Sequence, residues 1–197
     1  MNNRSDYFDI RSPFWRSCFE KASDYDDYLA QSPLHAKRWH GSASKMPSLT
    51  EEQRRRLVGH HRALNVLLVS AVWCGDCVRQ GPMIQKIVDV CDDVVRLRVI
   101  EREENSELRD EIRLMGAARV PVVVFLTEDF FEVGRFGDRM LTAYRKMAES
   151  EYGDTRWASR TSPEGETASE LGEWVDIFER CLLMARLSPL LRRRHGD

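Results

Sequence analysis

Residues 65–77 decide the fold and read Asn-Val-Leu-Leu-Val-Ser-Ala-Val-Trp-Cys-Gly-Asp-Cys. The first eight of them, Asn65–Val72, form a short apolar run without helical periodicity, which predicts a buried central strand. Over residues 76–91 the apolar side chains instead recur at the spacing of an amphipathic helix. Two cysteines, Cys74 and Cys77, therefore stand where a buried strand gives way to a helix.

The elements that follow predict an α/β fold. Val94–Glu101 alternates as a strand, and Asn105–Met115 suits a helix that Gly116 is placed to end. Val120–Leu126 predicts another buried strand, with Phe131–Phe136 as its antiparallel partner. The order strand, helix, strand, helix, strand, strand indicates a central mixed β-sheet flanked by helices.

The chain before this core predicts a helical or irregular N-terminal extension. Residues 1–49 mix aromatic side chains with charges and turn formers, enough for one or two short helices that pack on the core. They hold too few apolar side chains for a core of their own. Thr50–Gln53 then has the pattern of a capping box, which should open a helix to about Arg62. We expect the core to span residues 50–138.

Residues 139–197 predict C-terminal helices with an intervening loop. A helix is expected near Arg139–Ser150, and the Gly-, Ser-, Thr- and Pro-rich residues 152–166 favour a loop. Thr167–Glu170 has the pattern of a second capping box, opening a last helix that the Ser-Pro pair at 188–189 ends. The chain as a whole is expected to form a single domain.

Composition and charge narrow the classes of partner. The 30 basic and 32 acidic side chains leave a net charge of −2, so no net field attracts nucleic acid. Two arginine runs, Arg54–Arg56 and Arg192–Arg194, are interpreted as the solvated face of a helix and a polar tail. No stretch approaches the roughly 20 apolar residues that span a bilayer, and the N-terminus has no signal-peptide core. We expect a cytoplasmic protein with neither a nucleic-acid nor a membrane partner.

Cysteine usage singles out one pair. The chain has five cysteines, an odd number, and only Cys74 and Cys77 are close in sequence. Cys18, Cys91 and Cys181 are isolated and are expected to be small buried hydrophobic residues. A secreted disulfide scaffold would have a different cysteine pattern. In a reducing compartment the pair is expected to be catalytic or metal-binding.

Four landmarks resemble the thioredoxin superfamily. Trp73–Cys77 looks like its W-C-x-x-C motif, and Pro82 matches the proline that kinks the active-site helix. Val120 and Pro121 match the hydrophobic residue and the cis-proline that face the dithiol. Gly137 matches a glycine on the last strand near the site.

The resemblance extends over residues 66–137. More narrowly, the W-C-G-D-C motif and the Gly-Arg-Phe-Gly segment at Gly134–Gly137 are similar to a bacterial-type thioredoxin-like branch with helical N-terminal extensions. It implies a thioredoxin-like fold and a thiol-disulfide oxidoreductase that reduces or exchanges protein disulfides. It implies no cofactor.

The two cysteines are expected to have different roles. Cys74 falls at the N-cap side of the helix, where unpaired N–H groups and the helix dipole favour a thiolate, so it is the expected nucleophile. Cys77, one turn further in, would be the resolving thiol. Asp76 stands where many thioredoxins have Pro, and its carboxylate would oppose the thiolate, which favours a mild reductant or thiol exchanger. At Leu68 thioredoxins usually have a buried Asp that helps to move the proton of the resolving cysteine, and leucine cannot do this.

The remaining candidate site residues concern substrate binding. Trp73 would cover the dithiol and offer an apolar rim, although a packing aromatic at a strand end is an equal interpretation. Val120 and Pro121 would form an edge that pairs with an extended substrate. Gly75 and Asp76, between the cysteines, complete the candidate binding residues. The expected partners are protein or small-thiol disulfides and an unidentified electron donor, while the oligomeric state is not readable.

Two other functions remain open at this point. His60 and His61 could join Cys74 and Cys77 in a zinc site, but the intervening strand would hold the histidines roughly 25 Å away at 3.3 Å per residue. Alternatively, the chain keeps the fold as an adaptor or redox sensor without turnover, using its extensions as binding surface. Replacement of Cys74 by Ser discriminates the enzyme from the adaptor, because a turnover enzyme loses all activity whereas an adaptor keeps its partner.

Overall fold

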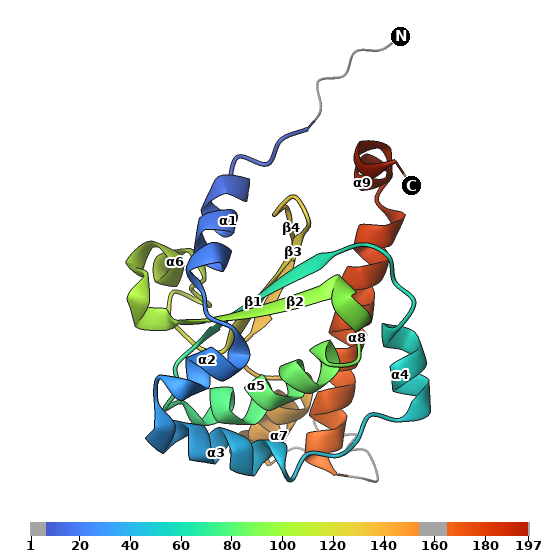
Figure 1. Ribbon diagram of the computed structural model, residues 1–197. Coiled ribbons are helices and arrows are strands. Elements are labelled where there is room, and N and C mark those ends of the chain that lie inside the picture. The colour runs from blue at the N-terminus through green and yellow to red at the C-terminus, as the bar shows by residue number, and fades with distance from the viewer. Residues whose placement is uncertain (1–6, 154–164, 197) are drawn as a thin grey trace.

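A computed structural model describes residues 7–153 and 165–196, and its centre is one four-stranded mixed sheet (Figure 1). The strand order is β2-β1-β3-β4, with β1 parallel to β2 and antiparallel to β3, and β4 antiparallel to β3. The predicted order of elements and the mixed sheet are therefore confirmed. The strands are β1 (Leu64–Ser70), β2 (Val95–Glu101), β3 (Val122–Thr127) and β4 (Glu132–Gly137).

Helices cover both faces of the sheet, which explains the apolar run of β1. All seven residues of β1 are buried, because the strand is flanked by neighbours on both edges and by helices on both faces. In Figure 1, α1 (Ser12–Lys21) and α6 (Ser106–Glu111) lie to one side of the sheet, and α4 (Glu51–Leu57) and α8 (Glu166–Leu187) to the other. The helix that carries the dithiol, α5 (Gly75–Val88), contains Pro82 and packs against α8.

The N-terminal extension contributes to the same hydrophobic core. It forms α1, α2 (Tyr25–Ala30) and α3 (Pro33–Ala43), where the sequence predicted one or two short helices. Trp15 and Trp39 are fully buried among core residues. Ser23, between α1 and α2, also forms an antiparallel bridge with Val99, which extends the sheet at its β2 edge. The extension therefore packs as an integral layer.

Two predicted helix ends are wrong. The capping box at Thr50 is confirmed, but α4 ends at Leu57 and does not reach Arg62, since Val58 is extended and Gly59 has a φ of 74°. Similarly, α6 begins after its cap Asn105 but ends at Glu111, before Gly116. Residues 114–117 instead form a turn closed by a bridge from Leu114 to Ala117, with φ of 77° at Gly116.

The C-terminal part contains one more helix than predicted. The first helix, α7 (Leu141–Tyr152), ends at Gly153 in the left-handed conformation, and the loop predicted over 152–166 lies largely outside the described residues. The second capping box is wrong, because Thr167 lies inside α8, which begins at Glu166. Ser188 ends α8 as predicted.

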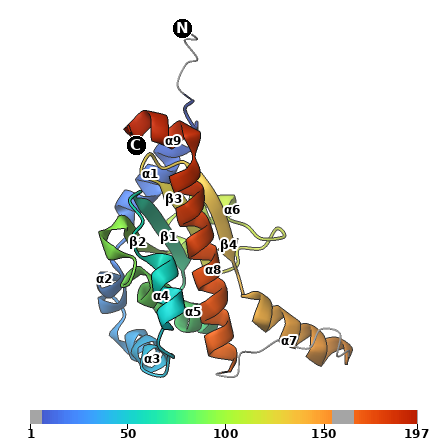
Figure 2. The ribbon, with the colours of Figure 1, turned by 90° about the vertical axis from the view of Figure 1, so that its right-hand side faces the viewer.

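The expected polar tail is instead a short helix. Ser188 caps the backbone N–H of Leu191 and opens α9 (Pro189–His195), which contains the arginine run Arg192–Arg194. Proline at the first position of a helix loses no hydrogen bond, since that N–H would be unpaired in any case. Figure 2 shows α9 at the far end of α8, away from α5.

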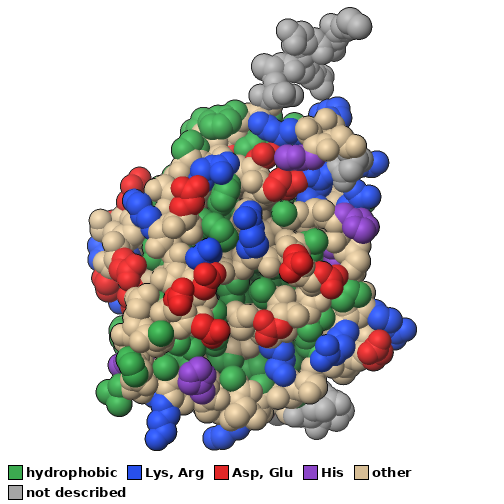
Figure 3. Space-filling model, viewed as in Figure 1, with side chains coloured by type: hydrophobic (Ala, Val, Ile, Leu, Met, Phe, Trp, Pro, Cys, Tyr) green, Lys and Arg blue, Asp and Glu red, His purple; other side chains and the backbone are tan. Residues whose placement is uncertain are grey.

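The surface carries mixed charge. Figure 3 shows acidic and basic side chains interspersed over one face of the molecule, in keeping with a net charge of −2. Among the residues that the structure describes, no helix combines the length and apolar character needed to cross a bilayer.

Candidate active site

The two cysteines occupy different environments at the start of α5. Cys74 is the N-cap residue, with its backbone N–H bonded to Ala71 O, and its side chain is partly exposed. Cys77 lies one turn into the helix and is fully buried. Both are free thiols, and they lie 3.6 Å apart. The structure thus brings together the pair that the sequence singled out, with one sulfur accessible and the other enclosed.

The contact between the two thiols polarises them in opposite directions. A hydrogen bond from the Cys77 side chain, helped by the backbone N–H groups of Cys77 and Asp76, lowers the pKa of Cys74 to about 6 against the opposing effect of burial. The same hydrogen bond, together with burial, raises the pKa of Cys77 far above the ordinary range of a thiol. The pKa values of the two thiols therefore shift in opposite directions, which favours the thiolate at Cys74 and the protonated thiol at Cys77.

Asp76 is paired with arginines, a feature that the sequence did not reveal. Its carboxylate lies 2.8 Å from Arg139, just before α7, and 3.5 Å from Arg79 on α5. Its negative charge raises the pKa of Cys74, as expected from its chemistry, but only as a minor contribution. Arg79 also faces the buried carboxylate of Glu170 on α8 at 3.2 Å, where burial raises the pKa of Glu170. The ion pairs offset the charge that would oppose the thiolate.

The turn before Cys74 is held in place by hydrogen bonds with residues from the N-terminal extension and from β2. Trp39 on α3 donates its indole N–H to Val72 O at 2.9 Å, and Arg38 donates to Trp73 O at 3.1 Å. On the other side, Val72 N–H donates to Glu101 Oε2 at 3.0 Å. These contacts fix the backbone that presents the dithiol.

Trp73 is an exposed aromatic residue beside this dithiol. Its side chain is 54% exposed, and the guanidinium of Arg102 lies 5.9 Å from its ring. Of the two interpretations, the apolar rim fits this exposure better than a packing aromatic does.

Val120 and Pro121 stand opposite Cys74. The peptide bond between them is cis, as the resemblance implied, and the Cys74 thiol lies 3.8 Å from Val120 O. Gly137 on β4 pairs with Val122, and a Cβ at this position would lie 2.4 Å from Pro121 O. A side chain at Gly137 would therefore displace Pro121, which explains in physical terms why this landmark is a glycine.

Three polar residues near Cys77 escaped sequence reasoning. Ser70, buried at the end of β1, lowers the pKa of Cys77, and Tyr28 on α2 donates its hydroxyl to Glu101 Oε2 at 2.7 Å. Tyr28 is about 50 residues away from the dithiol in sequence, and its position depends on how the extension folds back. The position flagged as unusual, Leu68, is fully buried and apolar.

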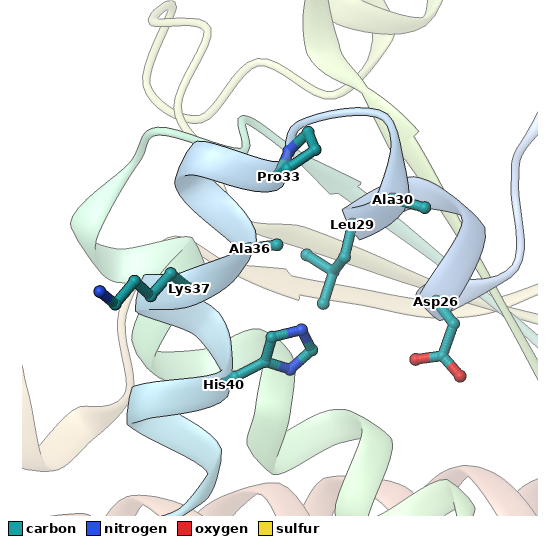
Figure 4. Close-up of a pocket in the computed structure, with 7 residues that line it drawn as sticks. All are labelled: Asp26, Leu29, Ala30, Pro33, Ala36, Lys37 and His40. Atoms are coloured by element: carbon teal, nitrogen blue, oxygen red, sulfur yellow. The ribbon is translucent and has the colours of Figure 1, made fainter.

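Among the described residues, no metal-binding group lies at the dithiol, and one of the surface hollows lies away from it. Within the described residues, no group of three or more His, Cys, Asp or Glu side chains is placed to hold a metal ion, and the ring of His60 bonds with Arg56 O. A hollow of about 550 Å³ lies between α2 and α3 (Figure 4), and neither Cys74 nor Cys77 lines it.

Comparisons with known proteins agree with this architecture. A family model described as thioredoxin matches residues 22–151. A crystal structure of a protein of unknown function from Pseudomonas aeruginosa is 16% identical over 92% of this chain and 96% of its own, with a TM-score of 0.60. An HIV epitope scaffold is also 16% identical, over 92% of this chain and 98% of its own, with a TM-score of 0.54. No curated protein matches.

At such identity the two structures indicate the fold alone. The family model, however, matches more than half of the sequence, and the matched range, residues 22–151, spans the positions of Cys74, Cys77, Pro121 and Gly137. The chain belongs to the thioredoxin family.

Proposed function

We propose that this protein is a thiol-disulfide oxidoreductase in which Cys74 is the nucleophile and Cys77 the resolving thiol. The observation that carries the proposal is the asymmetry of the pair: a partly exposed Cys74 with a lowered pKa stands 3.6 Å from a buried, protonated Cys77. Disulfide exchange requires a thiolate that substrate can reach and a second thiol close enough to close a ring.

The reaction proceeds in two exchanges. The Cys74 thiolate attacks one sulfur of a substrate disulfide, forms a mixed disulfide and expels the other substrate sulfur as a thiolate. Cys77, after losing its proton, attacks Cys74 Sγ, which forms the Cys74–Cys77 disulfide and releases the second substrate thiolate. Two electrons pass to the substrate, and a separate thiol donor returns the pair to its reduced form.

Substrate is proposed to bind across the exposed edge of the site. Trp73 supplies an apolar rim, and the backbone at Val120 and Pro121 lies opposite Cys74, where an extended segment that carries a disulfide would reach. Gly75 has no atom within 4 Å of its Cβ direction, so the approach next to Cys74 is open. Protein and small-thiol disulfides are both candidate substrates. A cytoplasmic location belongs to the same proposal, because five cysteines without a disulfide framework favour a reducing compartment.

An equilibrium redox titration tests the proposal. In a variant with Cys18, Cys91 and Cys181 replaced by Ser, alkylation and mass measurement would count the free thiols at each potential. We expect one reversible two-electron step between about −270 and −120 mV, because a nucleophile with a pKa near 6 falls between those of thioredoxin and of strongly oxidising relatives. If the pair never closes, the enzyme is excluded and the adaptor without turnover takes its place.

A further inference from the structure

Helix α7 presents most of its surface to the outside. Only one of its 12 residues, Thr142, is buried, and the helix packs mainly against α8. The side that faces α8 carries Thr142 and Lys146, which contact Glu173 and Glu166. In Figure 2, α7 extends away from the sheet. Its other side therefore faces outward.

An apolar stripe runs along this outward side. It has the spacing of a packing face, three, four and four residues, and consists of Leu141, Tyr144, Ala148 and Tyr152. The three large side chains are exposed, and Tyr152 is 73% exposed. The Tyr144 hydroxyl is bonded to Asp138, which holds this ring in place. Single exposed apolar side chains are ordinary, but a row of them at helical spacing indicates an interaction surface.

The stripe is symmetric about Ala148. Tyr144 and Tyr152 lie four residues on either side of it. If two copies of α7 pack antiparallel across a two-fold axis at Ala148, Tyr144 of each copy lies against Tyr152 of the other. A small side chain at the crossing point lets the two helices approach closely. The stripe therefore fits a second copy of itself.

The charges beside the stripe fit the same arrangement. Arg145 and Glu149 lie one helical turn apart on one side of the stripe. A two-fold axis across antiparallel helices brings this side against the same side of the other copy, so each Arg145 lies opposite Glu149 of the other copy. Neither residue has an ion pair within the described part of the chain, whereas Lys146 is paired with Glu166. This charge complementarity selects a second copy as the occupant of the stripe.

We propose that two copies of this chain associate through α7, packed antiparallel with Ala148 at the crossing point. The inference stands on the surface of α7 and is independent of the redox chemistry. A helix of 12 residues is about 18 Å long, so the contact falls at the small end of protein interfaces. A reversible dimer with a Kd in the micromolar range follows.

The dimer keeps the two dithiols apart. Each α7 begins two residues after Arg139, whose side chain lies 2.8 Å from Asp76 between the cysteines. In the antiparallel pair the two Leu141 positions lie at opposite ends, roughly 20 Å apart along the helix axis at 1.5 Å per residue. Each copy therefore retains a dithiol of its own.

Sedimentation velocity measures the association. The full chain is kept reduced, so that no intermolecular disulfide contributes, and its concentration is raised from about 1 to about 100 μM. We expect the mass to rise from 22.9 kDa towards twice that value. Ala148→Glu sets a carboxylate against its own copy at the crossing point and should weaken the dimer at least about tenfold.

Exchanged charges test the register of the two helices. Arg145→Glu and Glu149→Arg each set like charges opposite each other in a homodimer, so each variant alone should associate at least about tenfold more weakly than the parent. An equimolar mixture of the two variants restores opposite charges across the contact and should recover a dimer within about threefold of the parent Kd. Lys37→Glu is the matched control, because it reverses a charge at an exposed position on α3. It should leave the association unchanged.

Two results overturn the inference. A parent that stays at 22.9 kDa at the highest concentration excludes the dimer, and the stripe then belongs to a different partner. A dimer that neither charge reversal weakens, or that the mixture does not restore, uses another surface. Neither result bears on the proposed disulfide exchange, which the redox titration tests separately.

Discussion

At the scale of single residues, the lowered pKa of Cys74 depends chiefly on the neighbouring thiol, Cys77. The largest effect on the pKa of Cys74 is the hydrogen bond from Cys77, ahead of the backbone N–H groups at the start of α5. A side chain at position 77 that cannot donate should therefore leave Cys74 with a higher pKa, while the helix N-terminus continues to act on it.

Two replacements of Cys77 test this dependence. We expect the alkylation rate of Cys74 to rise with pH through about 6 in the parent and then to level off, because only the thiolate reacts. Cys77→Ala should move this midpoint upward by about one pH unit or more. Cys77→Ser retains a donor and should move it less. The measurement is the rate of reaction with iodoacetamide against pH, and equal midpoints in the two variants would contradict this account.

The arginine partners of Asp76 offset its negative charge, so we expect replacements of Asp76 and of Arg139 to shift the pKa of Cys74 in opposite directions. Asp76→Asn removes a negative charge that raises the pKa of Cys74 and should lower the alkylation midpoint. Arg139→Gln removes the closer of the two counter-ions, at 2.8 Å, and should raise it. Each shift should be roughly half a pH unit, since these groups are partly exposed and salt screens them. Shifts of the same sign in both variants would show that Arg139 does not act through Asp76.

The dithiol itself was predictable from sequence, whereas its polar surroundings were not. Cys74, Cys77 and Pro121 are separated by short, regular intervals that local pattern and family resemblance make readable. Tyr28, Glu101 and Arg139 reach the site from α2, β2 and the segment before α7, and nothing in their local sequence marks them. Their positions near the dithiol result from tertiary packing, which the pattern of a single sequence does not reveal.

At the scale of elements, α3 and α5 approach each other so closely that a glycine is required between them. A Cβ on Gly81 would lie 2.0 Å from the Trp39 ring, which is fully buried in the core. The same indole also donates a hydrogen bond to Val72 O. The packing of α3 against α5 is therefore linked to the turn that presents the dithiol. The helical periodicity predicted α5. It did not predict the contact with Trp39 that requires a glycine in the middle of this helix.

Replacing Gly81 by Ala should destabilise the protein, against the helix propensity of alanine. Overpacking in a rigid core costs about 1–3 kcal/mol. Gly41→Ala on α3 is the matched control, since Gly41 is exposed and has no atom within 4 Å of its Cβ position. It should raise the free energy of unfolding by up to about 1 kcal/mol, as alanine favours a helix. Urea denaturation of both variants measures the difference, and a stabilised Gly81→Ala variant would mean that Trp39 has room to shift.

Helix boundaries were predicted less well than helix existence, for physical reasons visible in two elements. In α8 the side-chain pattern of Thr167–Glu170 fits a capping box, but the backbone already becomes helical at Glu166 after Gly165, so Thr167 lies inside. In α6 the helix stops at Glu111 because the chain then turns to close the Leu114–Ala117 bridge. Both outcomes depend on where neighbouring segments must go, which overrides the local capping signal.

At the scale of the whole molecule, three buried cysteines report on whether the extensions and the core unfold together. Cys18 lies on α1, Cys91 after α5 and Cys181 on α8, so they sample the N-terminal extension, the core and the C-terminal helices. All three are buried, and burial raises their pKa to about 11 for Cys18 and about 12 for Cys91 and Cys181. Each can be alkylated only when its part of the structure opens.

We predict that the three thiols become reactive in a single cooperative opening. In variants that retain one of them and carry Ser at the other four cysteine positions, the alkylation rate in the native state gives the free energy of opening around that thiol. Because Trp15, Trp39 and the rings on α8 share one apolar core with the sheet, the three free energies should agree with each other and with global unfolding within about 1 kcal/mol. A markedly lower value at Cys18 alone would show that the N-terminal extension opens separately. In that case Tyr28 would detach from Glu101 while the core stayed folded, and the reactivity of the dithiol would depend on the state of the extension.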